Sequence, residues 1–142
     1  MDNLISTISE QGVLVLRLNR LDKKNALTGT MYQALCQQFD NAEQNSSIKC
    51  IVIIGSDQCF TAGNDLHDFL AASREQELPA VSFIHRLKSC TKPLLAATSG
   101  PAVGIGTTLL LHCDYVCSTN STLFKLPFTQ LGLCPEAGSS ML

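Results

Sequence analysis

Charged residues and long apolar runs are both scarce in this chain of 142 residues. Only 15% of the residues are charged while 45% are hydrophobic, and this balance excludes a disordered tail, which needs many charges and low hydrophobicity. No uninterrupted apolar run reaches the ~20 residues of a membrane span. The net charge of −2 argues against a nucleic-acid or anionic-membrane surface. The start, Met1-Asp2-Asn3, shows no secretory signal.

The seven cysteines follow no spacing that is typical of a metal site or a disulfide framework. Only Cys113 and Cys117 lie close together, and no paired C-x-x-C sets occur, so no zinc site is expected. Without a signal peptide, most of the thiols are expected to be free, small and buried, in a reducing compartment. The histidines also lack ligand spacing, and a surface or packing position is expected for each of them: His67, His85 and His112.

Alternating strand and helix patterns predict one α/β domain spanning residues 1–142. Its beginning is a hairpin that turns at Glu10-Gln11-Gly12, and parallel strands with right-handed crossovers are expected after it. The apolar run 50–54 is typical of a strand covered on both faces. The expected strands are 4–9, 13–18, 50–54, 94–98, 115–117 and 122–124, and the expected helices begin at about 28, 79 and 106.

Apolar residues at steps of three and four predict the inward faces of the first two helices. Thr28 is placed to cap the first helix, and Pro79 suits the first turn of the second. On the first helix the inward residues are Met31, Leu35, Phe39 and Ala42. On the second they are Val81, Ile84 and Leu87.

Two glycine-containing loops, 60–66 and 100–106, follow buried strands and precede helices. Backbone N–H groups at such positions attract anionic oxygen, and two of them converging would form an oxyanion hole. Ordinary turn glycines explain the spacing equally well. A dinucleotide site is disfavoured, because Gly104-Ile105-Gly106 offers only G-x-G, Leu109 stands where the third glycine belongs, and the expected acid is missing.

Three motifs together resemble the crotonase superfamily, the enoyl-CoA hydratase/isomerase family. The segment Asn19-Arg20 through Lys24-Asn25-Ala26-Leu27 is similar to the family's N-R-x-x-x-x-N-A-L loop. Phe60-Thr61-Ala62-Gly63-Asn64-Asp65-Leu66 is similar to its F-x-A-G-x-D-L loop, and Gly100 to Asp114 to its G-x-A-x-G-x-G segment leading to C-D. The resemblance implies a crotonase-like spiral of ββα units, of which this chain would be the N-terminal core without the C-terminal helices.

The resemblance also implies the site. The N–H groups of Asn64 and Ile105 would form the oxyanion hole for a thioester carbonyl. An acyl-CoA thioester would be the ligand, with no metal and no further cofactor, and a homotrimer or dimer of trimers is implied. The residues implied to bind the CoA substrate are Lys24, Ala26, Leu27, Ala62, Gly63, Asn64, Asp65, Leu66, Gly104 and Phe128.

In the resembled family, hydratases use two glutamates as acid and base. The matching positions here hold Thr108 and Phe128, so water addition by two carboxylates is not expected. Instead, Pro135-Glu136-Ala137-Gly138-Ser139-Ser140 resembles the P-E-G/A-x-S-S segment of one branch of the Δ3,Δ2-enoyl-CoA isomerases. That resemblance makes Glu136 the single catalytic base, in an apolar pocket whose candidate walls are Phe124, Phe128 and Leu133.

A plain structural interpretation of the acids stands beside the catalytic one. Pro-Glu is common at helix starts, so Glu136 could simply begin a helix that contains Leu142. Asp65 is expected to order its loop or start a helix, and Asp114 to hold the turn into its strand. Asp57 and Asp68 are expected at the solvated surface.

An enoyl-CoA isomerase of unsaturated fatty acid oxidation is therefore the predicted function. A hydratase or another crotonase-type lyase is the alternative, and a non-catalytic acyl-CoA-binding module is a second one. No nucleic-acid or membrane partner is expected. The predicted location is the bacterial cytoplasm, or the peroxisome or mitochondrion in a eukaryote. Because members of the family are nearly twice as long, the end at Leu142 is interpreted as a C-terminal truncation.

Overall fold

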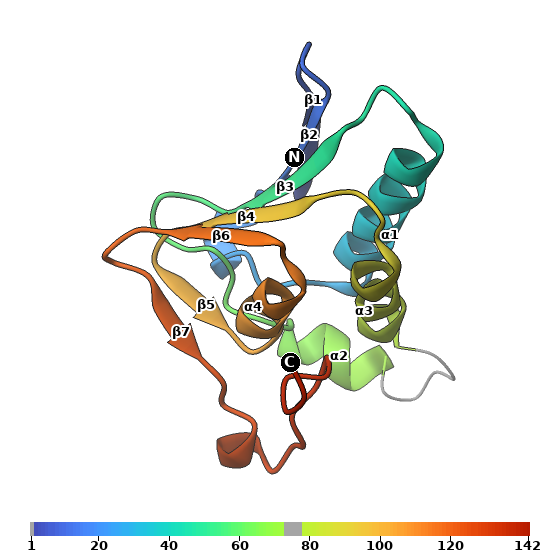
Figure 1. Cartoon of the computed structure of the whole chain (residues 1–142). Helices are drawn as coiled ribbons and strands as arrows, with labels where there is room; N and C mark the ends of the chain where they lie inside the picture. The colour runs from blue at the N-terminus through green and yellow to red at the C-terminus, as the bar shows by residue number, and fades with distance from the viewer. Residues whose placement is uncertain (1, 73–77) are drawn as a thin grey trace.

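The computed structural model describes residues 2–72 and 78–142 and shows a mixed α/β fold (Figure 1). Its larger sheet has the strand order β1-β2-β3-β4-β6, and β5 and β7 form a separate pair. The strands are β1 (Leu4–Ile8), β2 (Val13–Leu18), β3 (Cys50–Ile54), β4 (Leu94–Thr98), β5 (Pro101–Val103), β6 (Tyr115–Ser118) and β7 (Leu123–Lys125). The α-helices are α1 (Gly29–Gln44), α2 (Leu66–Ala72), α3 (Pro79–Ser89) and α4 (Ile105–Thr108). Short 3-10 turns are η1 (Leu21–Lys23), η2 (Leu109–His112) and η3 (Thr129–Leu131).

The predicted hairpin and the parallel strands are confirmed. β1 and β2 pair antiparallel around Gly12, whose φ of 86° is a left-handed conformation open to glycine. β2, β3, β4 and β6 then pair in parallel, with Leu16 beside Ile53 and Ile53 beside Ala96. In β3, Ile51 and Ile53 are buried, whereas Cys50, Val52 and Ile54 are only partly covered. The expectation that this strand is covered on both faces is therefore confirmed for one face.

Helices α1 and α3 pack side by side against the buried face of the sheet (Figure 1). The Thr28 hydroxyl accepts a hydrogen bond from the Met31 N–H at 3.3 Å and caps α1, as predicted. All four predicted inward residues of α1 are buried, and the ring of Phe39 meets the ring of Phe83 edge-on at 5.8 Å. This aromatic contact joins the two helices in the core.

The predicted inward face of α3 is wrong by one residue at its beginning. Val81 is 41% exposed, while the buried residues of the helix are Ala80, Phe83 and Leu87. The spacing 80, 83, 87 fits a helical stripe as well as 81, 84, 87 does, and contact with α1 decides between them. Phe83 brings the largest apolar side chain of the helix into the core, and this rotation turns Val81 outward.

The sequence pattern did not predict the short helix α2, the short strand β5 or the 3-10 turns η1 and η3. Helix α2 lies within the stretch between β3 and α3, and β5 lies inside the second glycine loop. β5 has only three residues and pairs in parallel with β7, a strand twenty residues further on. An element this short carries too few residues for a period to show.

The predicted helix beginning at Glu136 is absent. Residues 137–141 form turns, because Ala137 and Gly138 both adopt left-handed φ values, 54° and 70°. Two successive left-handed residues prevent the right-handed helix that Pro135-Glu136 would otherwise begin. Three backbone bonds close the turns instead, including Ser139 N–H to Glu136 O at 3.0 Å and Met141 N–H to Gly138 O at 2.8 Å.

All seven cysteines are free, but the prediction that most are buried is wrong. Cys59 is buried, and Cys117 and Cys134 are exposed. The other four are partly covered: Cys36, Cys50, Cys90 and Cys113. Three of these four pack against the core cluster from its rim, namely Cys36, Cys90 and Cys113.

Candidate active site

The first motif, residues 19–27, binds the first glycine loop through Asn25, whose side chain is completely buried. Its carboxamide oxygen accepts from the Arg20 N–H at 2.8 Å, and its nitrogen donates to the carbonyls of Cys59 and Phe60 at 3.1 Å each. The Thr61 hydroxyl donates to the Asn25 carbonyl at 2.6 Å. Asparagine suits this position because its φ is 54°, a left-handed value that asparagine tolerates well.

The backbone of residues 61–65 is held between the first motif and the second glycine loop. On one side, Leu27 N–H donates to Gly63 O at 2.8 Å and Asp65 N–H donates to Leu27 O at 2.9 Å. On the other side, Thr61 N–H donates to Pro101 O at 3.1 Å and Val103 N–H donates to Thr61 O at 3.0 Å. The structure thus brings together three segments that are far apart in the sequence.

This pairing determines the direction of the Asn64 N–H. Asn64 forms a parallel bridge with Leu27, in which Gly63 and Asp65 supply the hydrogen-bonding groups. Gly63 O and the Asn64 N–H belong to one trans peptide group and point in opposite directions, so the Asn64 N–H points away from Leu27. Within residues 2–72 and 78–142, no protein group accepts a hydrogen bond from the N–H of Asn64 or of Ile105.

Gly63 is a point of close approach between the two loops. It has a φ of 91°, and a Cβ placed on it would lie 2.8 Å from the carbonyl oxygen of Val103. Gly106 is similarly crowded, because its Cβ would lie 2.5 Å from the Cγ2 of Thr61. Only residues without a side chain allow the two loops to pack this closely.

Gly63→Ala is expected to lower the free energy of unfolding by about 2–3 kcal/mol, because a left-handed alanine and a clash with a carbonyl oxygen add together. Gly132→Ala is the matched control: its φ is 66°, but a Cβ there would meet nothing within 4 Å. In this control the free energy of unfolding should fall only by the cost of a left-handed alanine, about 1 kcal/mol. Urea unfolding of both variants measures the difference, and equal losses would contradict the close packing of the loops.

Asp65 orders the end of this loop, as predicted. Its carboxylate accepts from Arg20 Nη1 at 2.7 Å and from the N–H groups of His67 and Asp68 at 3.1 and 3.2 Å, at the start of α2. The hydrogen bond from Arg20, followed by the bond from the Asp68 N–H, lowers the pKa of Asp65. Arg20 also donates to Ala26 O at 3.0 Å, so the ion pair connects the first motif to α2.

The structure tests the predictions made for three other acids, Asp114, Asp68 and Asp57. Asp114 is confirmed as a residue that holds its strand, because its carboxylate accepts from the Leu94 N–H at 2.8 Å. Asp68 is not a solvated surface residue: it is partly covered, and its carboxylate accepts a hydrogen bond from the Gly29 N–H at the start of α1. This contact spans 39 residues, so no local pattern indicated it. Asp57 is exposed, as expected.

Glu136 lies on the turn that follows η3 and is partly covered. The turn is anchored beside it, where Ala137 is buried in the core cluster and the His112 ring Nε2 lies 2.8 Å from the Ala137 carbonyl oxygen. Burial raises the pKa of Glu136. Burial, followed by the negative charge of Glu136, raises the pKa of Tyr32 well above its usual value.

Tyr32 binds the first glycine loop, residues 60–66. Its hydroxyl donates a hydrogen bond to the side-chain oxygen of Asn64, and both residues line a small hollow between α1, α2 and the start of α3. The sequence pattern missed Tyr32 because it lies on the apolar face of α1, next to Met31. A hydroxyl on a face that is otherwise apolar was the available signal.

The structure brings most of the predicted substrate-binding residues together. The segments Lys24 to Leu27 and Ala62 to Asp65 are joined by three backbone hydrogen bonds, including Ala62 N–H to Lys24 O at 2.9 Å. Lys24 is exposed and lines a surface hollow with Leu21, Cys59 and Pro101. Leu66, at the start of α2, is 64% exposed. Gly104 lies directly before the free Ile105 N–H.

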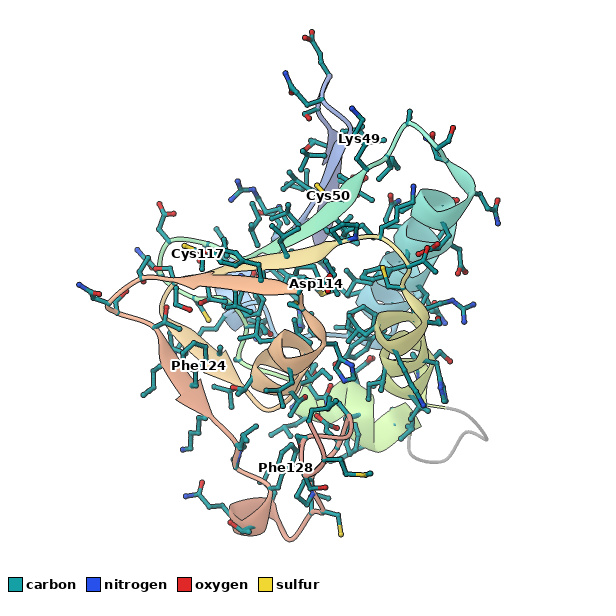
Figure 2. All side chains as sticks on the ribbon, viewed as in Figure 1. Lys49, Cys50, Asp114, Cys117, Phe124 and Phe128 are labelled. Atoms are coloured by element: carbon teal, nitrogen blue, oxygen red, sulfur yellow. The ribbon has the colours of Figure 1, made fainter. Side chains whose placement is uncertain are left out.

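The three residues predicted to surround Glu136 differ in exposure. Phe128 is 7% exposed, whereas Phe124 and Leu133 are 49% and 47% exposed. Figure 2 shows Phe124 on β7 and Phe128 further along the segment that leads away from the larger sheet. Phe128 therefore packs inside the protein, while Phe124 and Leu133 form part of the surface of this chain.

A family model described as enoyl-CoA hydratase/isomerase matches residues 8–142. The chain belongs to the enoyl-CoA hydratase/isomerase family. The structure superimposes on that of *Pseudomonas aeruginosa* OdaA with a TM-score of 0.94 and 44% identity, over 100% of this chain and 57% of that one. The crotonase fold that the motifs implied is thus confirmed.

Members of the family with different activities are similar to this chain. It is 37% identical to rat enoyl-CoA delta isomerase 2, over 96% of this chain and 36% of that protein. It is also 37% identical to 2,3-dehydroadipyl-CoA hydratase of *Escherichia coli*, over 92% of this chain and 52% of that protein. The chain therefore spans about half the length, or less, of these curated relatives. Among the described residues, no helix is long and apolar enough to cross a membrane.

Proposed function

We propose that this family member is an enoyl-CoA isomerase, which moves the double bond of a 3-enoyl-CoA to the 2-trans position in unsaturated fatty acid oxidation. The observation that carries the proposal is the placement of Glu136, a partly covered carboxylate on a turn that Ala137 anchors in the core cluster, where burial raises its pKa. A base with a pKa raised toward neutrality transfers protons efficiently in both directions.

In the proposed reaction, one carboxylate carries the proton both ways. Glu136 removes a proton from C2 of the 3-enoyl thioester, and the C2–H electrons form a dienolate whose negative charge rests on the thioester oxygen. The N–H groups of Asn64 and Ile105 would stabilise that oxygen, and each donor of this kind contributes about 3–4 kcal/mol to the transition state. The dienolate then takes the proton from Glu136 at C4, which leaves the double bond between C2 and C3. These steps draw on no metal or redox cofactor.

Two buried residues support isomerisation over hydration. Thr108 and Phe128 stand where the resembled hydratases carry glutamates, and they are 0% and 7% exposed. The Thr108 hydroxyl is buried and has no partner within the described part of the chain. Neither residue can activate water as a carboxylate does, which disfavours hydration by a pair of glutamates.

The substrate is proposed to be an acyl-CoA thioester held by the segments around Lys24 and Asn64. Lys24 is an exposed cation at the mouth of a hollow, a position that suits a phosphate of CoA. The homotrimer or dimer of trimers implied by the resemblance remains a prediction. Gel filtration with light scattering checks it.

Hydration is the second candidate, because the chain is as similar to a hydratase as to an isomerase. Product analysis separates the candidates: the protein is incubated with a cis-3-enoyl-CoA and, separately, with a trans-2-enoyl-CoA. We expect 2-trans-enoyl-CoA from the first substrate. Rapid formation of 3-hydroxyacyl-CoA from the second would contradict the isomerase proposal. Binding of acyl-CoA without turnover of either would support a non-catalytic module.

A further inference from the structure

The Tyr32 hydroxyl binds the side-chain carboxamide of Asn64, which the backbone pairing with Leu27 does not engage. The Leu27 bridge binds the peptide groups on both sides of Asn64, through Gly63 O and Asp65 N–H. The carboxamide is not part of that bridge. Asparagine side chains readily bind nearby backbone N–H groups, and such a bond would turn the loop toward a different conformation.

Tyr32 is built rigidly into the protein. It is 3% exposed, lies in the first turns of α1 just after the Thr28 cap, and its ring packs against Phe83 at a centroid distance of 5.6 Å. Burial and the Glu136 charge keep its phenol protonated. The hydroxyl therefore remains a hydrogen-bond donor to Asn64 at neutral pH, whatever the ionisation state of Glu136.

We propose that Tyr32 is a positioning residue, whose hydroxyl engages the Asn64 carboxamide and thereby keeps the Asn64 N–H free and aimed at the substrate carbonyl. This inference rests on the proposed function, in which that N–H is one of the two donors to the thioester oxygen. Tyr32 acts through Asn64 and takes no part in proton transfer. The N–H donors of an oxyanion hole must be aligned before the reaction starts. Loss of the hydrogen bond between Tyr32 and Asn64 therefore lowers kcat more than it weakens substrate binding.

Tyr32→Phe removes the hydroxyl and keeps the ring in the core. We expect kcat for double-bond isomerisation to fall about 10–100-fold with little change in KM, since misplacement by about 1 Å can cost 100-fold. The chain supplies a matched control, because its other tyrosine, Tyr115, is 64% exposed. Tyr115→Phe should keep the wild-type rate. Equal rates in Tyr32→Phe and the wild-type protein would overturn the inference.

A double-mutant cycle separates positioning from a general loss of stability. Asn64→Ala keeps the backbone N–H but removes the acceptor of the Tyr32 hydroxyl, so it should lower kcat about as much as Tyr32→Phe. If the two side chains act through one bond, Tyr32→Phe combined with Asn64→Ala should be no slower than the worse single variant. Losses that multiply in the double variant would overturn the inference.

The stretching frequency of a bound thioester carbonyl tests the inference without turnover. Isotope-edited infrared spectra of carbonyl-labelled butanoyl-CoA should show a lower frequency on the wild-type protein than in water, and part of that shift should be lost in Tyr32→Phe. A wild-type protein that lowers the frequency but does not isomerise 3-enoyl-CoA would disprove the isomerase proposal alone. An unchanged frequency in Tyr32→Phe would disprove the positioning role alone.

Discussion

Glu136→Gln is expected to abolish nearly all isomerisation, because glutamine keeps the shape of the side chain but cannot accept the C2 proton. A positioned general base contributes typically about 100–10,000-fold, so kcat should fall by a factor in this range. The KM for the acyl-CoA should change little, since the proposed binding segments around Lys24 and Asn64 are untouched. Steady-state rates with a cis-3-enoyl-CoA measure both quantities.

The stability of the same variant provides its control. Burial raises the pKa of Glu136 in the folded protein, so ionisation of this group opposes folding. A group whose pKa is raised in the folded state contributes stability at low pH. This contribution is lost as the pH rises through the pKa of the folded state. Glu136→Gln should therefore be at least as stable as the wild type at neutral pH. An inactive variant that is also unfolded would give no support to Glu136 as the base.

The pH dependence of the wild-type rate follows from the same shift. Only the ionised carboxylate accepts a proton, so kcat/KM should fall as the pH is lowered through the pKa of Glu136 in the free protein. Because burial raises this pKa, the fall should occur at a higher pH than for an exposed glutamate. A rate that stays constant down to the ordinary range of carboxylates would contradict the assignment.

Asn25→Ala is expected to be the most destabilising change among the residues around the site. It removes three side-chain hydrogen bonds and leaves the carbonyls of Cys59 and Phe60 without that donor in a buried place. It also puts alanine at a φ of 54°. Together these effects should lower the free energy of unfolding by about 3–5 kcal/mol, as measured by urea or thermal unfolding.

Two variants separate the causes of that loss. Asn25→Gly accepts the left-handed backbone but breaks the same hydrogen bonds, so it should retain most of the destabilisation. Asn41→Ala changes an exposed asparagine of α1 and should leave stability nearly unchanged. If Asn25→Gly were as stable as the wild type, the backbone conformation of residue 25 would be the cause, and the hydrogen bonds would contribute little.

The elements that the sequence predicted well are those with a long local period. Helix α1 shows apolar steps of three and four over sixteen residues, and strands β2, β3 and β4 are aliphatic runs beside turn residues. Such patterns arise because one face of each element must be buried. The motifs around Asn25, Gly63 and Gly104 likewise led to the correct family, since left-handed and close-packed backbone positions restrict the residue types there.

The sequence by itself thus determined the family, the α/β order of elements and the candidate site residues. Only the tertiary structure decided which neighbours those residues have. It turned Val81 outward, bound Asp68 to the start of α1, replaced the helix at Glu136 by turns, and joined Tyr32 to Asn64. The reason is physical: local spacing encodes which face of an element is apolar, whereas a hydrogen bond between residues 32 positions apart depends on how the elements pack.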